Sequence, residues 1–253
     1  MESNIPSNIE ETDFFKENAN LVDFFKNTCR KHQGKIAFEN YGVEISFEEL
    51  SEHANSFASW LSQSYKPGDR IAVMMPNMLA YPVIVYGALM AGIVVVNVNP
   101  LYTTRELEHV LSDSEAKVLL VWEGVAHVVE KSGLASVDKV VVTTIGDLLG
   151  FKGKIINFVA RKIKKLVPQF NLNNAEGFLD ALSEGAKAQF NDVDVSINDT
   201  AFLQYTGGTT GVSKGAILTH RNILANIIQA FYTIDPEMYE SSDNEQKTAI
   251  CPL

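Results

Sequence analysis

The feature that most limits how this chain folds is a long stretch without charge that begins directly after Arg70. Part of it, residues 78–96, is long enough to cross a bilayer as one helix. However, Gly92 divides the stretch, and the run Ile-Val-Val-Val-Asn-Val that follows is typical of a strand buried inside a parallel sheet. We therefore expect a buried helix at residues 79–91 and a central strand at residues 93–98, with a membrane span as the alternative.

Segments typical of strands and helices alternate along the rest of the chain. Ser46 with Glu49, and Thr103 with Glu106, form capping boxes that mark the first turns of two helices. An amphipathic helix is expected at residues 20–32. Strands are expected at residues 36–39, 71–75, 93–98, 117–122, 139–143 and 201–205, and as a short segment after the lysine at 214. Strands separated by helices predict an α/β protein with a layered α/β/α architecture and a largely parallel sheet.

Composition excludes several classes of protein. The 253 residues are 46% hydrophobic and 21% charged, which suits a large core in one or two domains. A net charge of −10 argues against a nucleic-acid partner, whose binding surface would be basic. Cys29 and Cys251 are too few and too far apart for a disulfide framework or a zinc site. The first twenty residues are acidic and have no cleavable signal pattern, so a cytoplasmic location is expected.

A loop rich in glycine and threonine, QYTGGTTGVSKGAI at residues 204–217, is the strongest candidate for a binding site. Its glycines leave backbone amides uncovered, and successive amides form a nest for anions. Threonine hydroxyls and the ammonium group of Lys214 add donors suited to phosphate. The order of residues differs from a Walker A loop, so the loop is expected to bind polyphosphate by another route. A mobile linker is the alternative.

Residues 205–215 resemble the phosphate loop of the adenylate-forming superfamily, Tyr-Thr-Ser-Gly-Thr-Thr-Gly-x-Pro-Lys-Gly. Gly207 stands where that pattern has serine, and Ser213 stands where it has proline. Two further stretches are similar to long-chain fatty acid-CoA ligases of this superfamily: Met-Pro-Asn at residues 75–77 followed by GIVVVNVNPLYTTRELEHV at residues 92–110, and Leu-Thr-His-Arg-Asn at residues 218–222. The resemblance implies an acid-thiol ligase that uses ATP, Mg²⁺ and coenzyme A to activate a fatty acid.

The resemblance also implies which residues bind the nucleotide. Contacts to the β and γ phosphates of ATP are expected from Thr206, Gly207, Gly208, Thr209, Thr210, Gly211 and Lys214. The Thr206 hydroxyl is expected near the Mg²⁺ ion. The serine hydroxyl of the family pattern is lost at Gly207, although its backbone donor is kept.

Members of the family are about twice as long as this chain, so residues 1–253 are expected to form the N-terminal part of an AMP-binding domain. The small C-terminal domain and the adenylation lysine of the family would then lie beyond Leu253, and no catalytic residue is assigned. We expect this chain to be inactive alone and to have an exposed sheet edge. The alternatives are another adenylation enzyme of the superfamily, acting on a shorter or aromatic acid, and a noncatalytic fragment that binds phosphate or membrane.

The segment FKGKIINFVARKIKKLV at residues 151–167 reverses the charge of the rest of the chain. It carries six of the 21 Lys and Arg residues and no acidic residue. At 100° per residue its apolar side chains gather on one half of a helix and most of its cations on the other. Such a helix either lies peripherally on the inner face of a membrane or packs on its own domain with a solvated cationic face. Residues 168–199 are polar and are expected to be connecting structure.

The histidines are assigned no chemistry. His109 and His127 lie within expected helices and have no partner motif, so a structural role is favoured. His220 follows Thr219, the expected N-cap of a helix that runs to residue 231, and is expected to be a surface residue.

Overall fold

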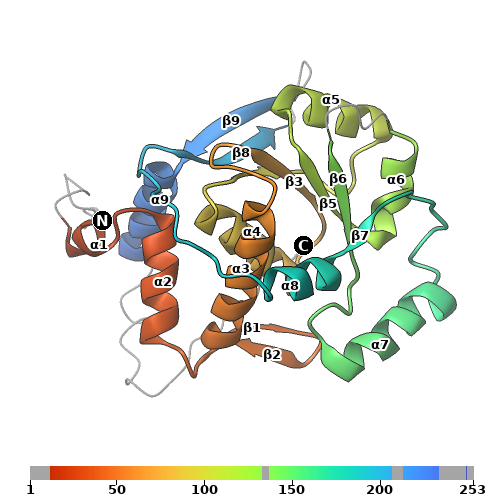
Figure 1. Cartoon of the computed structure of the whole chain (residues 1–253), viewed down its shortest axis with the longest axis horizontal. Coiled ribbons are helices and arrows are strands. Elements are labelled where there is room, and N and C mark those ends of the chain that lie inside the picture. Colours follow the sequence, from red (N-terminus) through yellow and green to blue (C-terminus); the bar gives the residue numbers. More distant parts are fainter. Residues whose placement is uncertain (1–11, 133–136, 207–212, 234–248, 250–253) are drawn as a thin grey trace.

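The computed structural model describes residues 12–132, 137–206, 213–233 and 249. In these residues a sheet of seven strands has the order β7-β6-β5-β3-β4-β8-β9, and every neighbouring pair is parallel except β8 and β9 (Figure 1). The strands are β3 (Arg70–Met74), β4 (Val94–Asn97), β5 (Val118–Trp122), β6 (Lys139–Thr143), β7 (Glu176–Gly177), β8 (Thr200–Thr206) and β9 (Lys214–Thr219). The prediction of an α/β fold with a largely parallel sheet is confirmed.

Helices cover both faces of this sheet. The helices are α1 (Asp13–Glu17), α2 (Leu21–Lys31), α3 (Phe47–Ser62), α4 (Ala80–Met90), α5 (Thr104–Ser114), α6 (Ala126–Glu130), α7 (Gly150–Phe158), α8 (Phe178–Gly185) and α9 (His220–Thr233), with a 3₁₀ turn η2 (Glu123–Val125) and a π-helical segment η3 (Val159–Ile163). Both predicted capping boxes, at Ser46 and at Thr103, are present. They begin α3 and α5 by pairing each hydroxyl with a backbone N–H three residues on.

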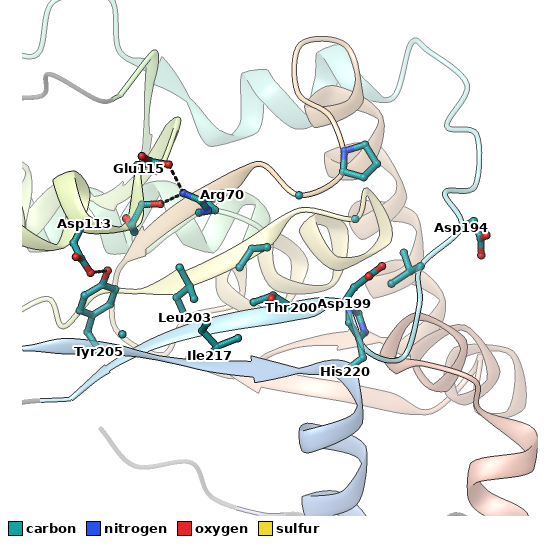
Figure 2. Close-up of a pocket in the computed structure, with 17 residues that line it drawn as sticks. Arg70, Asp113, Glu115, Asp194, Asp199, Thr200, Leu203, Tyr205, Ile217 and His220 are labelled. Atoms are coloured by element: carbon teal, nitrogen blue, oxygen red, sulfur yellow. Dashed lines mark hydrogen bonds and ion pairs between the residues drawn. The ribbon is translucent and has the colours of Figure 1, made fainter.

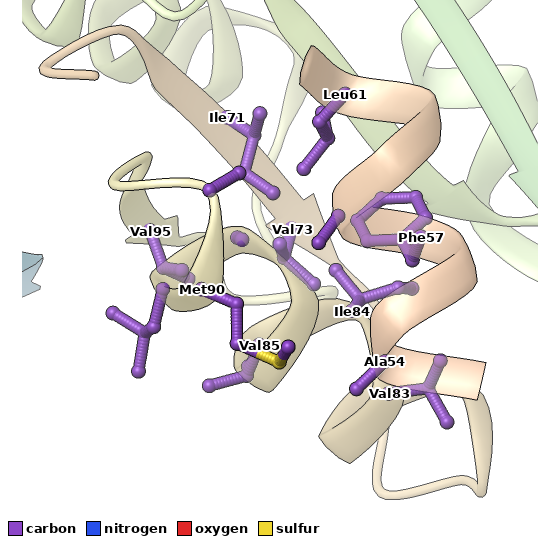
Figure 3. Close-up of a cluster of buried hydrophobic side chains, with 14 of the residues drawn as sticks. Ala54, Phe57, Leu61, Ile71, Val73, Val83, Ile84, Val85, Met90 and Val95 are labelled. Carbon is purple, nitrogen blue, oxygen red and sulfur yellow. The ribbon is translucent and has the colours of Figure 1, made fainter. Parts of the chain in front are cut away.

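The core is divided by the sheet because successive strand residues point to opposite faces. In β3, Ile71 and Val73 pack into a cluster with α2, α3, α4 and α8, whereas Ala72 and Met74 pack into a second cluster with α5 and α6. The larger cluster includes Phe57 of α3 and Ile84 of α4, both fully buried (Figure 3). The layered α/β/α architecture follows from these two clusters.

The uncharged stretch folds as its division at Gly92 predicts. Helix α4 packs against α3. Gly87 permits the close approach of the two helices, since a Cβ at this position would lie 2.7 Å from the carbonyl oxygen of Ala54. Gly92 has a positive φ of 68°, which lets the chain turn from α4 into β4. Within the described residues, no helix has the length and apolar character that crossing a bilayer requires.

Two segments differ from the sequence-based expectation. Strand β1 (Ile36–Asn40) pairs with β2 (Val43–Ser46) in a separate antiparallel hairpin, and β2 was not predicted. Residues 168–199, expected as connecting structure, contain β7 and α8. The buried side chains Phe178, Ala181 and Leu182 pack α8 against α3. This helix was not predicted because an amphipathic helix of eight residues is too short to stand out from a polar sequence.

Candidate nucleotide site

The strand pair β8–β9 brings two of the predicted site residues together. Thr206 is the last residue of β8 and Lys214 is the first of β9, and they are direct partners in the antiparallel pair. Partners of this kind place their side chains on the same face, with Cβ atoms about 5 Å apart. Both residues are exposed. A hydroxyl and an ammonium group therefore stand side by side where the Gly/Thr loop leaves and rejoins the sheet.

The position of this pair is one where α/β sheets bind ligands. β8 is parallel to β4, so Thr206 lies at the carboxyl end of a parallel strand, beside the carboxyl end of β4 at Asn97. In open α/β sheets, ligands bind outside the carboxyl ends of such strands. Gly207, Gly208, Thr209, Thr210 and Gly211 lie outside the described residues, as does the anion nest predicted for them.

Helix α5 holds both ends of the loop. Before the loop, Tyr205 donates its hydroxyl to Oδ2 of Asp113 at 2.6 Å. After it, His109 Nε2 donates to the carbonyl oxygen of Ser213 at 2.8 Å, and the His109 ring meets the Tyr205 ring edge-on. Burial, together with the hydrogen bond to Asp113, raises the pKa of Tyr205 above its usual range. The contact of His109 is of the kind expected from a structural histidine.

A row of neutral polar side chains crosses the carboxyl ends of β4 and β8. This row was not predicted from the sequence. Tyr81 of α4 donates its hydroxyl to Oδ1 of Asn97 at 3.0 Å, and Asn97 Nδ2 donates to Oε1 of Gln204 at 3.1 Å. Gln204 is two residues before Thr206 in β8, so the two share a face of the sheet. The signal available in the sequence was Asn97 itself, a polar residue at the end of a β-branched run.

A cavity beside the β8–β9 pair does not suit a triphosphate. It has a volume of about 740 Å³ and lies between the end of α5, the start of β3 and the β8–β9 pair (Figure 2). Carboxylates dominate its charged lining, which consists of Arg70, Asp113, Glu115, Asp194 and Asp199. Arg70 is already engaged by Glu115 Oε2 at 2.8 Å and by the carbonyl oxygen of Ser114 at 2.7 Å. Net negative charge would repel polyphosphate, so the loop end of β8 remains the candidate site.

The prediction for His220 was wrong. His220 is only 2% exposed, although it was expected on the surface. Its Nδ1 accepts a hydrogen bond of 3.2 Å from the backbone N–H of Leu21, which joins the first turn of α9 to that of α2. Burial lowers the pKa of His220 to about 4, so the ring is neutral at neutral pH. The surface position of His220 was predicted only from its neighbours in the sequence. Its burial depends on Leu21 of α2, which is 199 positions away.

The residues at the loop end fit the groups that ATP and Mg²⁺ would bring. With ATP and Mg²⁺ bound, the Thr206 hydroxyl would be an oxygen ligand for Mg²⁺ beside phosphate oxygens, and Lys214 would bring a positive charge to those oxygens. Among the described residues, no group of three or more His, Cys, Asp and Glu side chains is arranged to hold a metal ion.

The parallel sheet with a Gly/Thr loop between β8 and an antiparallel edge strand is the N-terminal part of the adenylate-forming fold. The chain belongs to the family of AMP-binding enzymes, whose model matches residues 25–253.

Proteins named as long-chain-fatty-acid–CoA ligases are among its relatives. The one from Salmonella typhimurium is 46% identical over 227 residues, and the one from Haemophilus influenzae is 43% identical over 237 residues. These matches cover 88% and 92% of this chain but 40% and 42% of the relatives, so the chain spans less than half of their length.

Solved structures give the same fold. A long-chain-fatty-acid-CoA ligase from Archaeoglobus fulgidus superposes with a TM-score of 0.62 at 27% identity, covering 84% of this chain and 39% of that one. An anthranilate CoA ligase superposes with a TM-score of 0.66 at 19% identity, covering 83% of this chain and 37% of that one. At 19% identity the second match concerns the fold alone.

Proposed function

We propose that this chain is the nucleotide-phosphate-binding part of a long-chain fatty acid-CoA ligase. In the proposed reaction a fatty acid carboxylate attacks the α-phosphorus of ATP, and pyrophosphate leaves to give an acyl-adenylate. The thiol of coenzyme A then attacks the acyl carbon, and AMP leaves. The observation that carries the proposal is the pairing of Thr206 with Lys214 at the carboxyl end of β8, in a chain 46% identical to ligases of that name.

The residues of this chain would bind and orient the departing end of ATP. Lys214 would neutralise charge on the β and γ phosphates, and Thr206 would share their oxygens with Mg²⁺, which lowers the charge on the leaving pyrophosphate. The backbone amides of Gly207, Gly208, Thr209, Thr210 and Gly211 would complete the phosphate contacts, as the family resemblance implies. The hydrogen bonds of His109 with Ser213 and of Asp113 with Tyr205 would keep both ends of the loop in place.

The proposal places the enzyme in the cytoplasm, where ATP and coenzyme A are available, with its fatty acid taken from the inner face of a membrane. Long-chain fatty acids partition into bilayers because burying their methylene groups is favourable. A peripheral contact with that surface would shorten the path of the substrate.

ATP binding to the 253-residue chain, measured by equilibrium dialysis with Mg²⁺, tests the site. Lys214→Ala should weaken binding at least about tenfold, since a phosphate contact by a charged donor is lost. Lys187→Ala removes an exposed lysine from outside the site and is the matched control. Equal affinity of Lys214→Ala and the unsubstituted chain would refute the assignment.

A second measurement tests whether this chain forms an acyl-adenylate by itself, and with which acid. Hydroxylamine trapping with palmitate and ATP detects acyl-adenylate directly. Hydroxamate that forms with palmitate supports the fatty acid ligase, and hydroxamate only with a shorter or aromatic acid supports another adenylation enzyme. A chain that binds ATP through Lys214 and yields no hydroxamate with any acid acts alone as a phosphate-binding module.

A further inference from the structure

The helix formed by α7 and η3 packs on the protein through a face that mixes small, polar and apolar residues. Its buried residues are Gly153 and Ala160. Its half-buried residues include Asn157, Ile156 and Val159, and Ile156 packs against the larger core cluster. Asn157 Oδ1 accepts from the backbone N–H of Gly146 at 2.8 Å, and its Nδ2 donates to Oγ1 of Thr144 at 2.8 Å. Gly153 lies against the backbone of Gly146 with no room for a Cβ between them.

Most of the large apolar side chains of the same segment point away from the core. Phe151 is 78% exposed, Phe158 is 59% exposed and Ile163 is 63% exposed. Ile155 and Leu166 are also more than half exposed. The large apolar side chains of a surface helix normally face the core, so most of those in this segment lack the cover that such a helix gives them. Ile156 packs on the domain, whereas five other large apolar side chains of the segment are exposed.

Besides Asn157, the side chains of Arg161 and Lys152 tie this helix to the rest of the protein. Arg161 binds the buried carboxylate of Glu123 through Nε and Nη2, and Lys152 donates to the carbonyl oxygen of Tyr41 in the β1–β2 turn. At the end of η3, Lys165 has a positive φ of 50°, and the N–H of Leu166 folds back to the carbonyl oxygen of Ala160 at 2.9 Å. The apolar face is held outward by these contacts, and Figure 1 shows α7 at the rim of the molecule.

The charges on this face select the partner. All six Lys and Arg residues of residues 151–167 are exposed, and the segment contains no acidic residue, although the whole chain carries a net charge of −10. An anionic surface would repel most of this protein and attract this segment, which fixes the orientation of binding. Aromatic and aliphatic side chains between cations suit the boundary between lipid headgroups and acyl chains.

We propose that residues 151–167 form a docking surface for a membrane containing anionic phospholipid, with Phe151, Ile155 and Phe158 entering the headgroup boundary. Lys164 and Lys165 contact lipid phosphates beside them. The docking surface lies near the β7–β6–β5 side of the sheet, since its helix follows β6 and binds Glu123 at the end of β5. The candidate nucleotide site lies at the β8–β9 edge, so the two functions are separable by substitution.

Co-sedimentation of the 253-residue chain with phosphatidylcholine vesicles, with and without phosphatidylglycerol, tests the proposal. Binding is expected only with phosphatidylglycerol and should weaken as salt is raised. Phe151→Ser/Phe158→Ser should lower the partition coefficient at least about tenfold, because apolar area no longer leaves water. Leu101→Ser/Leu179→Ser replaces two exposed leucines elsewhere and should bind as the unsubstituted chain does.

A second pair of variants isolates the cations. Lys164→Glu/Lys165→Glu should lower the partition coefficient at least about tenfold, since each cation near an anionic surface contributes about 1 kcal/mol. Lys31→Glu/Lys187→Glu changes the net charge equally at exposed positions on other elements and should have a smaller effect. All four variants alter exposed side chains, so thermal unfolding should confirm that each is folded.

Three outcomes would overturn the proposal. The first is failure of the unsubstituted chain to bind phosphatidylglycerol vesicles, and the second is equal binding by the docking-surface variants and their controls. The third is a dimer in sedimentation equilibrium without lipid that Phe151→Ser/Phe158→Ser disperses while vesicle binding is absent, which would assign the face to a second copy. None of these outcomes bears on ATP binding through Lys214, which is measured separately.

Discussion

Arg161 binds a single oxygen of Glu123 with two of its nitrogens, at 2.8 Å from Nε and 2.7 Å from Nη2. The other carboxylate oxygen of Glu123 is buried without a partner among the described residues. Burial therefore outweighs the attraction of Arg161, and the pKa of Glu123 is raised from its ordinary value of 4.5. The pair orients the π-helical segment η3, although removing the carboxylate from water costs free energy.

Because the pKa of Glu123 is raised in the folded state, its contribution to the free energy of unfolding decreases as pH rises. Above 4.5 the unfolded chain loses this proton more readily than the folded chain, so the free energy of unfolding decreases until the folded group also ionises. Glu123→Gln keeps an acceptor for Arg161 and removes the ionisation. Urea unfolding from pH 4.5 upward should show a smaller decline for Glu123→Gln, and parallel curves for the two proteins would contradict the prediction.

His220 should act in the opposite sense. Its folded-state pKa of about 4 lies below the ordinary 6.5, so the unfolded chain takes up the proton first as pH falls. The stability contributed by neutral His220 is complete above pH 6.5 and is lost as pH falls toward 4, a loss on the order of 3 kcal/mol. His220→Asn keeps an acceptor for the N–H of Leu21 and should flatten urea unfolding free energies between pH 7 and 5. His32→Asn, at a more exposed histidine, should flatten them less.

Gly185 should be intolerant of any side chain. A Cβ at this position would run into the carbonyl oxygen of Ser56, where α8 crosses α3. Gly185→Ala should lower the free energy of unfolding by about 2 kcal/mol or more, because backbone must move to make room. Gly34→Ala is the matched control, since a Cβ at Gly34 meets nothing within 4 Å, and it should be close to neutral. Similar urea midpoints for the two variants would refute the close packing of α8 on α3.

The hydrogen bond from Tyr205 to Asp113 should affect nucleotide binding as well as stability. Tyr205→Phe removes one hydrogen bond of 2.6 Å at the start of the loop and should cost about 1 kcal/mol in the free energy of unfolding. ATP binding should weaken several-fold, because the loop must then be ordered by the ligand. Equilibrium dialysis of Tyr205→Phe beside Tyr102→Phe, which changes a tyrosine outside the β8–β9 pair, would measure this. Unchanged affinity in Tyr205→Phe would show that α5 does not position the loop.

Local sequence predicted the elements whose signals are short in range. The capping boxes of α3 and α5, the break at Gly92 and the β-branched strands depend on residues a few positions apart, and the structure has all of them. The hairpin strand β2 and the short helix α8 escaped prediction because four or eight residues give too little periodicity to distinguish them from loops.

The sequence by itself determined the alternation of strands and helices, the family resemblance and the residue types of the phosphate loop, because these are properties of neighbouring residues. Tertiary structure alone decided that Thr206 faces Lys214, that Asn97 meets Gln204, that His220 is buried against α2, and that Phe151 and Phe158 of α7 are exposed. Each of these depends on which distant segments pack together. Periodicity fixes which side chains share a helix face, but only long-range contacts fix whether that face is covered.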